Sequence, residues 1–170
     1  MLDTSFVVDA MLTGQSRHAD AYRYLLMLAI ADTHIYFNRL LELELAEAAY
    51  KIAIKEQFGN KRARDMRTDG RALRRASRLA GRLSAAWDGV LSNFTWGIVE
   101  LHEVAAEAPL FMERGLASYD AVHAASAISL GVEHLVTTDS GFGMVKETDL
   151  TIVTHSSLLG ATRRHRTRSI

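Results

Sequence analysis

The chain contains no cysteine, which excludes disulfide bonds, zinc sites built from thiolates and thiol nucleophiles. This absence suits a reducing cytoplasm, where we expect the protein to reside. No run of about eighteen apolar residues is present and the N-terminus lacks the pattern of a signal peptide, so we expect no contact with a membrane. With 170 residues, 48% of them hydrophobic and 24% charged, the composition is that of one globular domain.

Several motifs of cofactor and acyl chemistry are also missing. The sequence has no G-x-S-x-G elbow, no Walker phosphate loop and no G-x-G-x-x-G fingerprint. The single proline, Pro109, leaves few enforced breaks, so we expect a largely helical chain.

The zero net charge hides an uneven distribution of basic residues. Nine of them lie between Lys61 and Arg82, and four more lie in the tail after Gly160. The rest of the chain carries seven basic residues against eighteen acidic ones. Arginines spaced three and four apart form one helical stripe, which indicates either contact with an RNA backbone, contact with an acidic protein segment or a solvated surface. The arginines that we expect to contact RNA are Arg67, Arg71, Arg74 and Arg78.

Apolar spacing of three and four predicts helices, and short β-branched runs predict strands. The expected helices cover 19–31, 39–58 with Asn38 as its cap, the Arg-rich stretch to Trp87 with an interruption near Gly70, 104–114 with a break at Pro109, and a helix capped by Ser118 and ended by Gly131. The expected strands cover 34–38, 94–101, 134–138 and 151–154. This alternation predicts an α/β fold with a parallel sheet, whose ligand site lies beyond the carboxyl ends of the strands.

Acidic residues occur where that rule places a ligand. Asp3 follows Met1-Leu2, Asp139 follows the predicted strand at 134–138, and Asp120 lies in the first turn of a helix. Carboxylate oxygens are the ligands that Mg²⁺ and Mn²⁺ prefer, and such metals neutralise a phosphodiester and activate water. Each acid also has a structural interpretation, as a helix cap, an Asx turn or a favourable charge at a helix N-terminus.

Three segments together are more specific. They are LDTSFVVDAML near the N-terminus, FNRLLELELAEAAY, and LASYDAVHAASAISLGVEHLVTTDSGF, and they resemble the PIN domain family in order and spacing over residues 1–155. The resemblance implies a three-layer fold in which helices cover both faces of a central parallel sheet. It also implies an endoribonuclease that depends on Mg²⁺ or Mn²⁺, often the VapC-like toxin of a toxin–antitoxin pair and commonly a homodimer.

The resemblance assigns the metal and catalytic acids residue by residue. Asp3 matches the first acid, Asp120 the third and Asp139 the fourth. Apart from this match, we expect Ser5 and Thr138, which lie beside Asp3 and Asp139 in the sequence, to contact the substrate.

The second acid requires a choice on the helix at 39–58. Counting from Asn38 selects Glu44, which directly precedes a Leu as in the family. Glu47 lies one turn later and is the alternative. Glu42 points about 200° away from Glu44 and is expected at the surface.

Other side chains are expected to be structural. We expect His123 to be a partly buried helix residue, Asp9 to lie at the surface, and Phe94, Trp87 and Trp96 to lie in the core rather than stack on bases. The first strand has only two residues before Asp3, which predicts either a start further upstream or a short strand. We expect one domain at 1–158 and a basic tail at 159–170.

Two alternatives to a ribonuclease follow from the same residues. One is a non-catalytic PIN-like module that binds RNA or protein through its arginines. The other is a DNA nuclease or phosphatase with a similar carboxylate site. A haloacid-dehalogenase phosphatase fits poorly, because Asp3 is not followed by a second Asp at a spacing of two.

Overall fold

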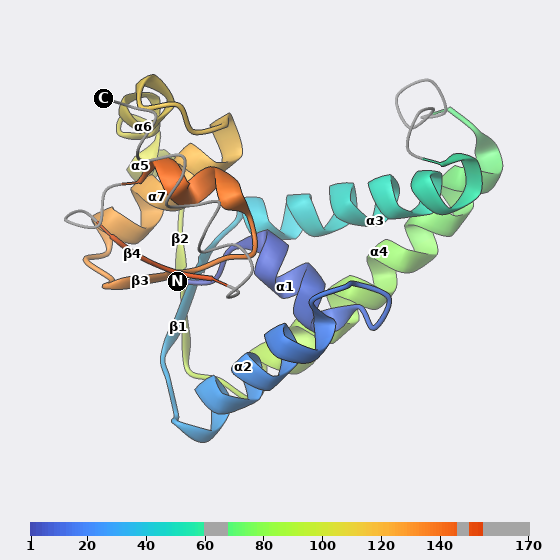
Figure 1. Ribbon diagram of the computed structural model, residues 1–170, viewed down its shortest axis with the longest axis horizontal. Helices are drawn as coiled ribbons and strands as arrows, with labels where there is room; N and C mark the ends of the chain where they lie inside the picture. Colours follow the sequence, from blue (N-terminus) through green and yellow to red (C-terminus); the bar gives the residue numbers. More distant parts are fainter. Residues whose placement is uncertain (60–67, 146–149, 155–170) are drawn as a thin grey trace.

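The computed structural model describes residues 1–59, 68–145 and 150–154. Helices alternate with short strands in an α/β fold (Figure 1). The α-helices are α1 (Thr4–Met11), α2 (His18–Ile30), α3 (Leu40–Phe58), α4 (Gly70–Leu91), α5 (Leu101–Val104), α6 (Ala108–Glu113) and α7 (Ser118–Ser129). The strands are β1 (Ile35–Asn38), β2 (Trp96–Val99), β3 (His134–Val136) and β4 (Thr151–Val153), and a 3-10 helix, η2 (Ser140–Met144), follows β3.

The strands form two parallel pairs, β1 with β2 and β3 with β4. The N-terminal segment 1–3 lies between the pairs and is hydrogen-bonded to both. The Leu2 amide donates to the Tyr36 carbonyl at 2.9 Å, and the Asp3 amide donates to the Val136 carbonyl at 2.9 Å. Leu2 pairs with Val136 as a single parallel bridge. Asp3 therefore sits at the carboxyl ends of the strands.

Helices α3 and α4 lie side by side as an arm that projects away from the strands (Figure 1). Helix α4 begins where the Asp69 carboxylate accepts the amides of Arg71 at 3.0 Å and Ala72 at 2.8 Å. Its buried stripe recurs every three or four residues and consists of Ala72, Ala76, Leu79, Leu83 and Trp87. The arginines of α4 lie on the opposite, exposed face.

Two predicted helix ends are confirmed. Gly59 follows α3 with φ of 73°, and Gly131 follows α7 with φ of 64°. A residue with a Cβ adopts such angles only with strain, so glycine stops both helices at defined positions.

One buried cluster lies where the arm meets the strands and α1, and another surrounds α6, α7 and β3. Phe37 of β1 and Trp87 of α4 pack edge to face, with ring centroids 5.1 Å apart. Leu41 and Leu45, at the start of α3, belong to the same buried cluster. This packing fixes the first turns of α3, and with them Glu44, relative to the strands.

Three predictions of helix ends are wrong. Asn38 does not cap α3; its amide instead donates to Ser126 at 3.0 Å and contacts His123 at 3.1 Å, because it is fully buried against α7. Ser118 is the first residue of α7 rather than its cap, and Ala117 occupies the cap position without a side-chain bond. Pro109 does not break a helix but lies in the first turn of α6, where its missing N–H costs nothing.

Two predictions of burial are also wrong. Asp9 is 8% exposed rather than at the surface, because α1 packs against α2 and the loop before it. Trp96 is 46% exposed because it begins β2 at the margin of the strands. Its ring centroid still lies 5.7 Å from that of Phe37. Trp87 lies in the core as predicted, at 2% exposed, and Phe94 is half-buried.

Some predictions fall outside the described residues. They concern Arg67, the boundary at 158 and the basic tail at 159–170. Within the described ranges, no helix combines the length and the apolar character that crossing a membrane requires.

Candidate active site

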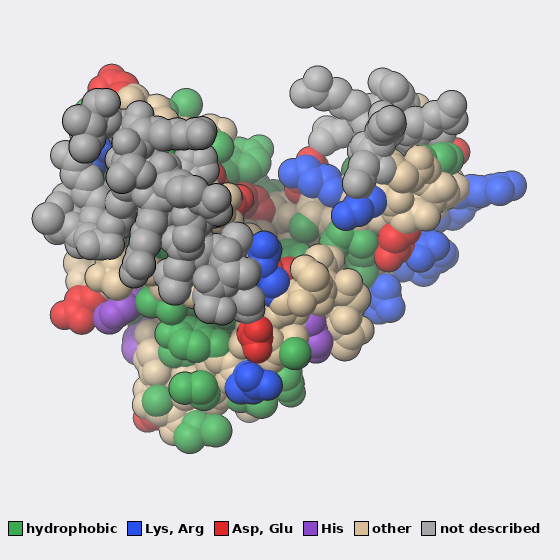
Figure 2. All heavy atoms as spheres, viewed as in Figure 1, with side chains coloured by type: hydrophobic (Ala, Val, Ile, Leu, Met, Phe, Trp, Pro, Cys, Tyr) green, Lys and Arg blue, Asp and Glu red, His purple; other side chains and the backbone are tan. Residues whose placement is uncertain are grey.

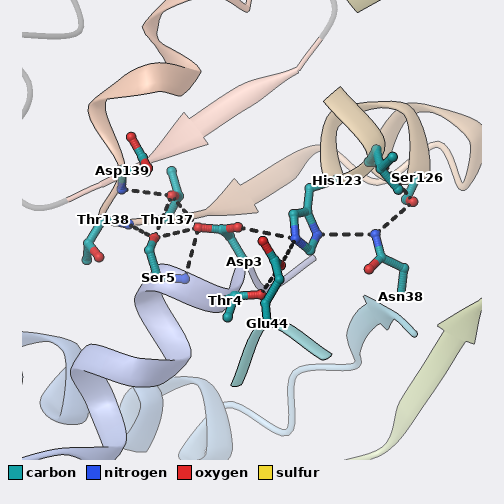
Figure 3. Close-up of polar contacts among 11 residues, drawn as sticks. Asp3, Thr4, Ser5, Asn38, Glu44, His123, Ser126, Thr137, Thr138 and Asp139 are labelled. Carbon is teal, nitrogen blue, oxygen red and sulfur yellow. Dashed lines mark hydrogen bonds and ion pairs between the residues drawn. The ribbon is translucent and has the colours of Figure 1, made fainter. Parts of the chain in front are cut away.

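Asp3 is buried and held at the start of α1 by hydroxyl groups from two segments (Figure 3). Its Oδ2 accepts the Ser5 amide at 3.2 Å, the Ser5 hydroxyl at 2.5 Å and the Thr137 hydroxyl at 2.7 Å. The side chain is thus the N-cap of α1, as its structural interpretation predicted. The same bonds fix the carboxylate rigidly, so capping and a role in the site do not compete.

The loop after β3 is tied to the same hydroxyls. The Thr138 amide donates to Ser5 Oγ at 3.0 Å, and the Asp139 amide donates to Thr137 Oγ1 at 2.9 Å. Asp139 itself accepts the Gly141 amide at 2.7 Å, which is the Asx turn predicted for it. Strand β3 ends at Val136, although the Thr137 amide still donates to the Val153 carbonyl at 2.9 Å.

Glu44 reaches this cluster from the second turn of α3. Its Oε2 accepts the Thr4 hydroxyl at 2.5 Å and lies 2.6 Å from Nε2 of His123. His123 is fully buried, and the same nitrogen lies 3.6 Å from Oδ1 of Asp3. The imidazole therefore links the first and second acids of the predicted site (Figure 3).

The protonation of His123 is coupled to the orientation of Asn38. Burial opposes a charge on the ring, but the hydrogen bond to Glu44 and the carboxylate of Asp3 outweigh it and raise the pKa of His123. The Asn38 amide nitrogen faces Nδ1, an arrangement that suits a neutral ring there. Protonation of Nδ1 would favour a flipped amide, which presents the oxygen of Asn38; that oxygen has no partner within the described residues.

A cleft of about 450 Å³ lies at these residues, and we call it the carboxylate cleft. Its lining includes six acids, namely Asp3, Asp9, Glu44, Glu47, Asp120 and Asp139. Two bases, Arg17 and Lys51, line it as well. The four acids chosen from the sequence thus come from four separate segments to one cleft. Glu42 is exposed, pairs with Arg39 at 3.5 Å and does not line it, as predicted.

Crowding of the acids perturbs one of them strongly. Burial, followed by the carboxylates of Asp139 and Asp3, raises the pKa of Asp120 to about 7. His123, when protonated, acts in the opposite direction and lowers the pKa of Asp120. Near neutral pH, Asp120 is therefore protonated in a large fraction of the molecules. A positive charge in the cleft would lower that fraction.

This pKa predicts a pH-dependent cost to stability. Below pH ~4 Asp120 is protonated in both the folded and the unfolded chain, and it costs nothing. Between pH ~4 and the folded pKa of about 7, Asp120 ionises in the unfolded chain but not in the cleft, so the stability present at low pH is lost across this range. Asp120→Asn should therefore raise the free energy of unfolding at pH 8 by ~1–2 kcal/mol, a value reduced from the full shift because the side chain is only half-buried.

Urea denaturation in the presence of a chelator measures this effect. The gain should shrink towards zero at pH 4–5. Asp88→Asn, which changes an exposed aspartate of α4, is the matched control and should show no gain at either pH. An Asp120→Asn protein no more stable than the wild type at pH 8 would contradict the electrostatic interpretation.

The donor set fits a hard divalent cation in chemical kind. All four predicted acids offer oxygen, and a Cβ built at Gly141 would lie 3.1 Å from Oδ2 of Asp120 and 3.2 Å from Oδ1 of Asp139. Glycine thus keeps open the space that these two carboxylates share. In their present rotamers, however, no three carboxylate or imidazole groups of the described residues are close enough together to hold a metal ion. Binding would require side-chain rotation.

The arginine stripe lies away from the cleft. Arg71, Arg74 and Arg78 are exposed on α4, and none of the three lines the carboxylate cleft. Figure 2 shows the basic side chains gathered on the arm. Arg75, on the same helix, pairs with Glu56 of α3 at 2.6 Å. Ser5 and Thr138 do line the cleft, so of the predicted substrate contacts these two lie beside the acids.

Three residues at the site, Asp9, Arg17 and His123, were not among the predicted site residues. Asp9 is four residues after Ser5, a spacing that puts both on one face of α1 and that could have placed Asp9 beside the strand ends. Arg17 lies in a loop with no pattern to reveal it, and its Nη1 is 4.0 Å from Oδ2 of Asp9. The three-residue spacing of Asp120 and His123 did indicate a shared face, but not that the histidine joins the acids.

Comparison with known proteins supports the sequence resemblance. A search of curated proteins finds no match to this chain. The family model described as "PIN domain" matches residues 1–147, which include all four predicted acids. The chain therefore belongs to the PIN domain family.

Proposed function

We propose that this protein is an endoribonuclease that depends on Mg²⁺ or Mn²⁺ and acts as a VapC-like toxin in the cytoplasm. PIN domains are generally nucleases, commonly metal-dependent ribonucleases. The observation that carries the proposal is the convergence of Asp3, Glu44, Asp120 and Asp139 on one cleft at the carboxyl ends of parallel strands. The proposal includes a PIN-type three-layer arrangement, in which segment 1–3 joins the two strand pairs into one central sheet.

In this proposal each acid has a distinct part. A bound divalent cation supplies charge neutralisation at the phosphodiester and activation of water. Asp3, held by three hydrogen bonds, keeps a fixed ligand position, while Asp120 and Asp139 complete the ligand set across Gly141. A cation held there would lower the pKa of Asp120, because its charge would oppose the repulsion from Asp139 and Asp3 that adds to the effect of burial. Glu44 is oriented by Thr4 and His123 to complete the site or to position the water.

A non-catalytic PIN-like module is the second candidate, and one observation favours it. No three of the relevant groups in the described part of the chain are close enough to hold a metal without rearrangement. Calorimetric titration with Mn²⁺ separates the candidates. A nuclease should bind Mn²⁺ with release of protons near pH 7, and the purified protein should cut RNA only when Mn²⁺ or Mg²⁺ is present. If the protein neither binds Mn²⁺ nor cuts RNA, the proposal is overturned in favour of the module.

The proposed partners are RNA, an antitoxin and a second copy of the chain. Exposed arginines of α4 offer charge to RNA or to an acidic antitoxin segment. On α2, the apolar side chains of Tyr22, Leu26 and Ile30 lie four residues apart and are 47%, 45% and 86% exposed. An exposed apolar stripe of this kind supports contact with another protein. A neighbouring reading frame that encodes a short protein with an acidic tail would support the toxin role.

A further inference from the structure

A second, smaller cavity of about 160 Å³ adjoins the carboxylate cleft, and we call it the side cavity. Its walls are mostly apolar and come from Phe6 of α1, Ala21 and Tyr24 of α2, Val136 of β3 and Val153 of β4. Its volume is several times the ~30 Å³ that one water occupies in the liquid. The side cavity is thus large enough for an organic group rather than a single solvent molecule.

The side cavity and the carboxylate cleft share two lining residues, Arg17 and Thr138. The Arg17 guanidinium lies at the boundary, with Nη1 3.5 Å from the Thr138 carbonyl oxygen and 4.0 Å from Oδ2 of Asp9. Its side chain is 33% exposed, so it retains access to solvent and to an anion. A phosphate that bridges the two spaces would meet this guanidinium, which suits bidentate contact with phosphate oxygens.

Polar residues line part of the side cavity, and they include Asp20 and Thr137 besides Arg17 and Thr138. Thr154 lines it as well, and its hydroxyl is buried without a hydrogen-bond partner in the described part of the chain. Phe6 and Tyr24 already pack edge to face, with centroids 6.0 Å apart, and leave an aromatic wall. Mostly apolar walls with a few placed polar groups are typical of a pocket for a heterocycle.

We propose that the side cavity receives one nucleobase of a single-stranded RNA, from a nucleotide next to the phosphate that is cut. This inference rests on the proposed function, because it assumes that the carboxylate cleft takes that phosphate. A flat apolar face of the base contacts the Tyr24 ring, with Phe6 beside it, and its polar edge meets the Thr154 hydroxyl. Arg17 binds the intervening phosphate. The base then lies in the side cavity and the phosphate in the carboxylate cleft. This arrangement fixes which phosphate of the RNA reaches the acids.

Fluorescence anisotropy in EDTA tests this without cleavage. The probes are a labelled oligouridylate and a ribose-phosphate chain of the same length without bases. The wild-type protein should bind the oligouridylate about tenfold more tightly, the size of one base–aromatic contact. Tyr24→Leu should remove most of that ratio while binding the baseless chain as the wild type does. Tyr22→Leu, the same change two residues earlier on an exposed face of α2, should keep the ratio.

A second variant covers the case in which Tyr24→Leu fails to fold. Ala21→Leu adds three carbons that can enter the side cavity, and a thermal melt establishes that each variant is folded. Ala21→Leu should reduce the ratio of oligouridylate affinity to baseless-chain affinity in the same way as Tyr24→Leu. A wild-type ratio near one, or an unchanged ratio in either folded variant, would overturn the inference. These results are expected if the side cavity instead holds an apolar side chain of a protein partner. Base-dependent binding by a protein that cuts no RNA would overturn the proposed activity alone.

Discussion

Asp3→Asn and Asp120→Asn are each expected to lower Mn²⁺-dependent RNA cleavage by about a thousandfold, because a bound cation contributes several kcal/mol to transition-state stabilisation. Asparagine at position 3 retains an oxygen that caps α1 and accepts the Ser5 amide, so the change removes charge and little structure. Asparagine at position 120 relieves repulsion in the absence of metal. Both proteins should therefore fold normally and still fail to cut.

Initial rates on a long RNA, with equal concentrations of folded protein, measure the loss. Asp88→Asn again serves as the matched control, since its carboxylate is exposed on α4 and outside the cleft, and it should cleave at the wild-type rate. Calorimetry should show that the two site variants bind Mn²⁺ far more weakly than this control. Cleavage near the wild-type rate in either site variant would show that the carboxylate is not a metal ligand.

His123→Ala is expected to lower the free energy of unfolding by about 3 kcal/mol, measured in urea without metal. The imidazole is fully buried and touches Glu44, Asp3 and Asn38, so its removal leaves an unfilled space and unpartnered polar groups. The melting temperature should fall by roughly 6–12 °C for a domain of this size.

A second histidine provides the comparison. His102 is exposed on α5, and His102→Ala should change the free energy of unfolding by less than about 0.5 kcal/mol. If His123→Ala were as stable as His102→Ala, the buried link between Glu44 and Asp3 would contribute nothing, and the position of Glu44 would need another explanation.

Buried support of this kind explains why a cluster of like charges can persist before a cation binds. Hydroxyls from Ser5 and Thr137 hold one oxygen of Asp3, and His123 holds Glu44. The unfavourable burial and repulsion of the cluster fall mainly on Asp120, the acid whose pKa is raised to about 7. Asp120 is therefore the residue at which proton binding and stability are most closely linked, and the proposed metal would change both.

Local pattern was sufficient for much of the fold. Helix periodicity and the stops at Gly59 and Gly131 are properties of a few neighbouring residues, and the structure has them where the sequence predicts. It was less reliable at helix starts, because Asn38 and Ser118 are common cap residues whose side chains a tertiary contact can use elsewhere. The Asn38 amide is directed to α7, which lies some eighty residues further along the chain.

By itself, the sequence determined which segments carry acids at strand ends and that the chain resembles the PIN family, since spacing within a segment is a local property. Only the tertiary structure decided that Asp9 is buried beside Arg17 and that His123 joins Glu44 to Asp3. It also decided that the α4 arginines lie away from the cleft. These facts depend on how α1, α3 and α7 pack around the strands, and packing is set by the whole core rather than by any one segment.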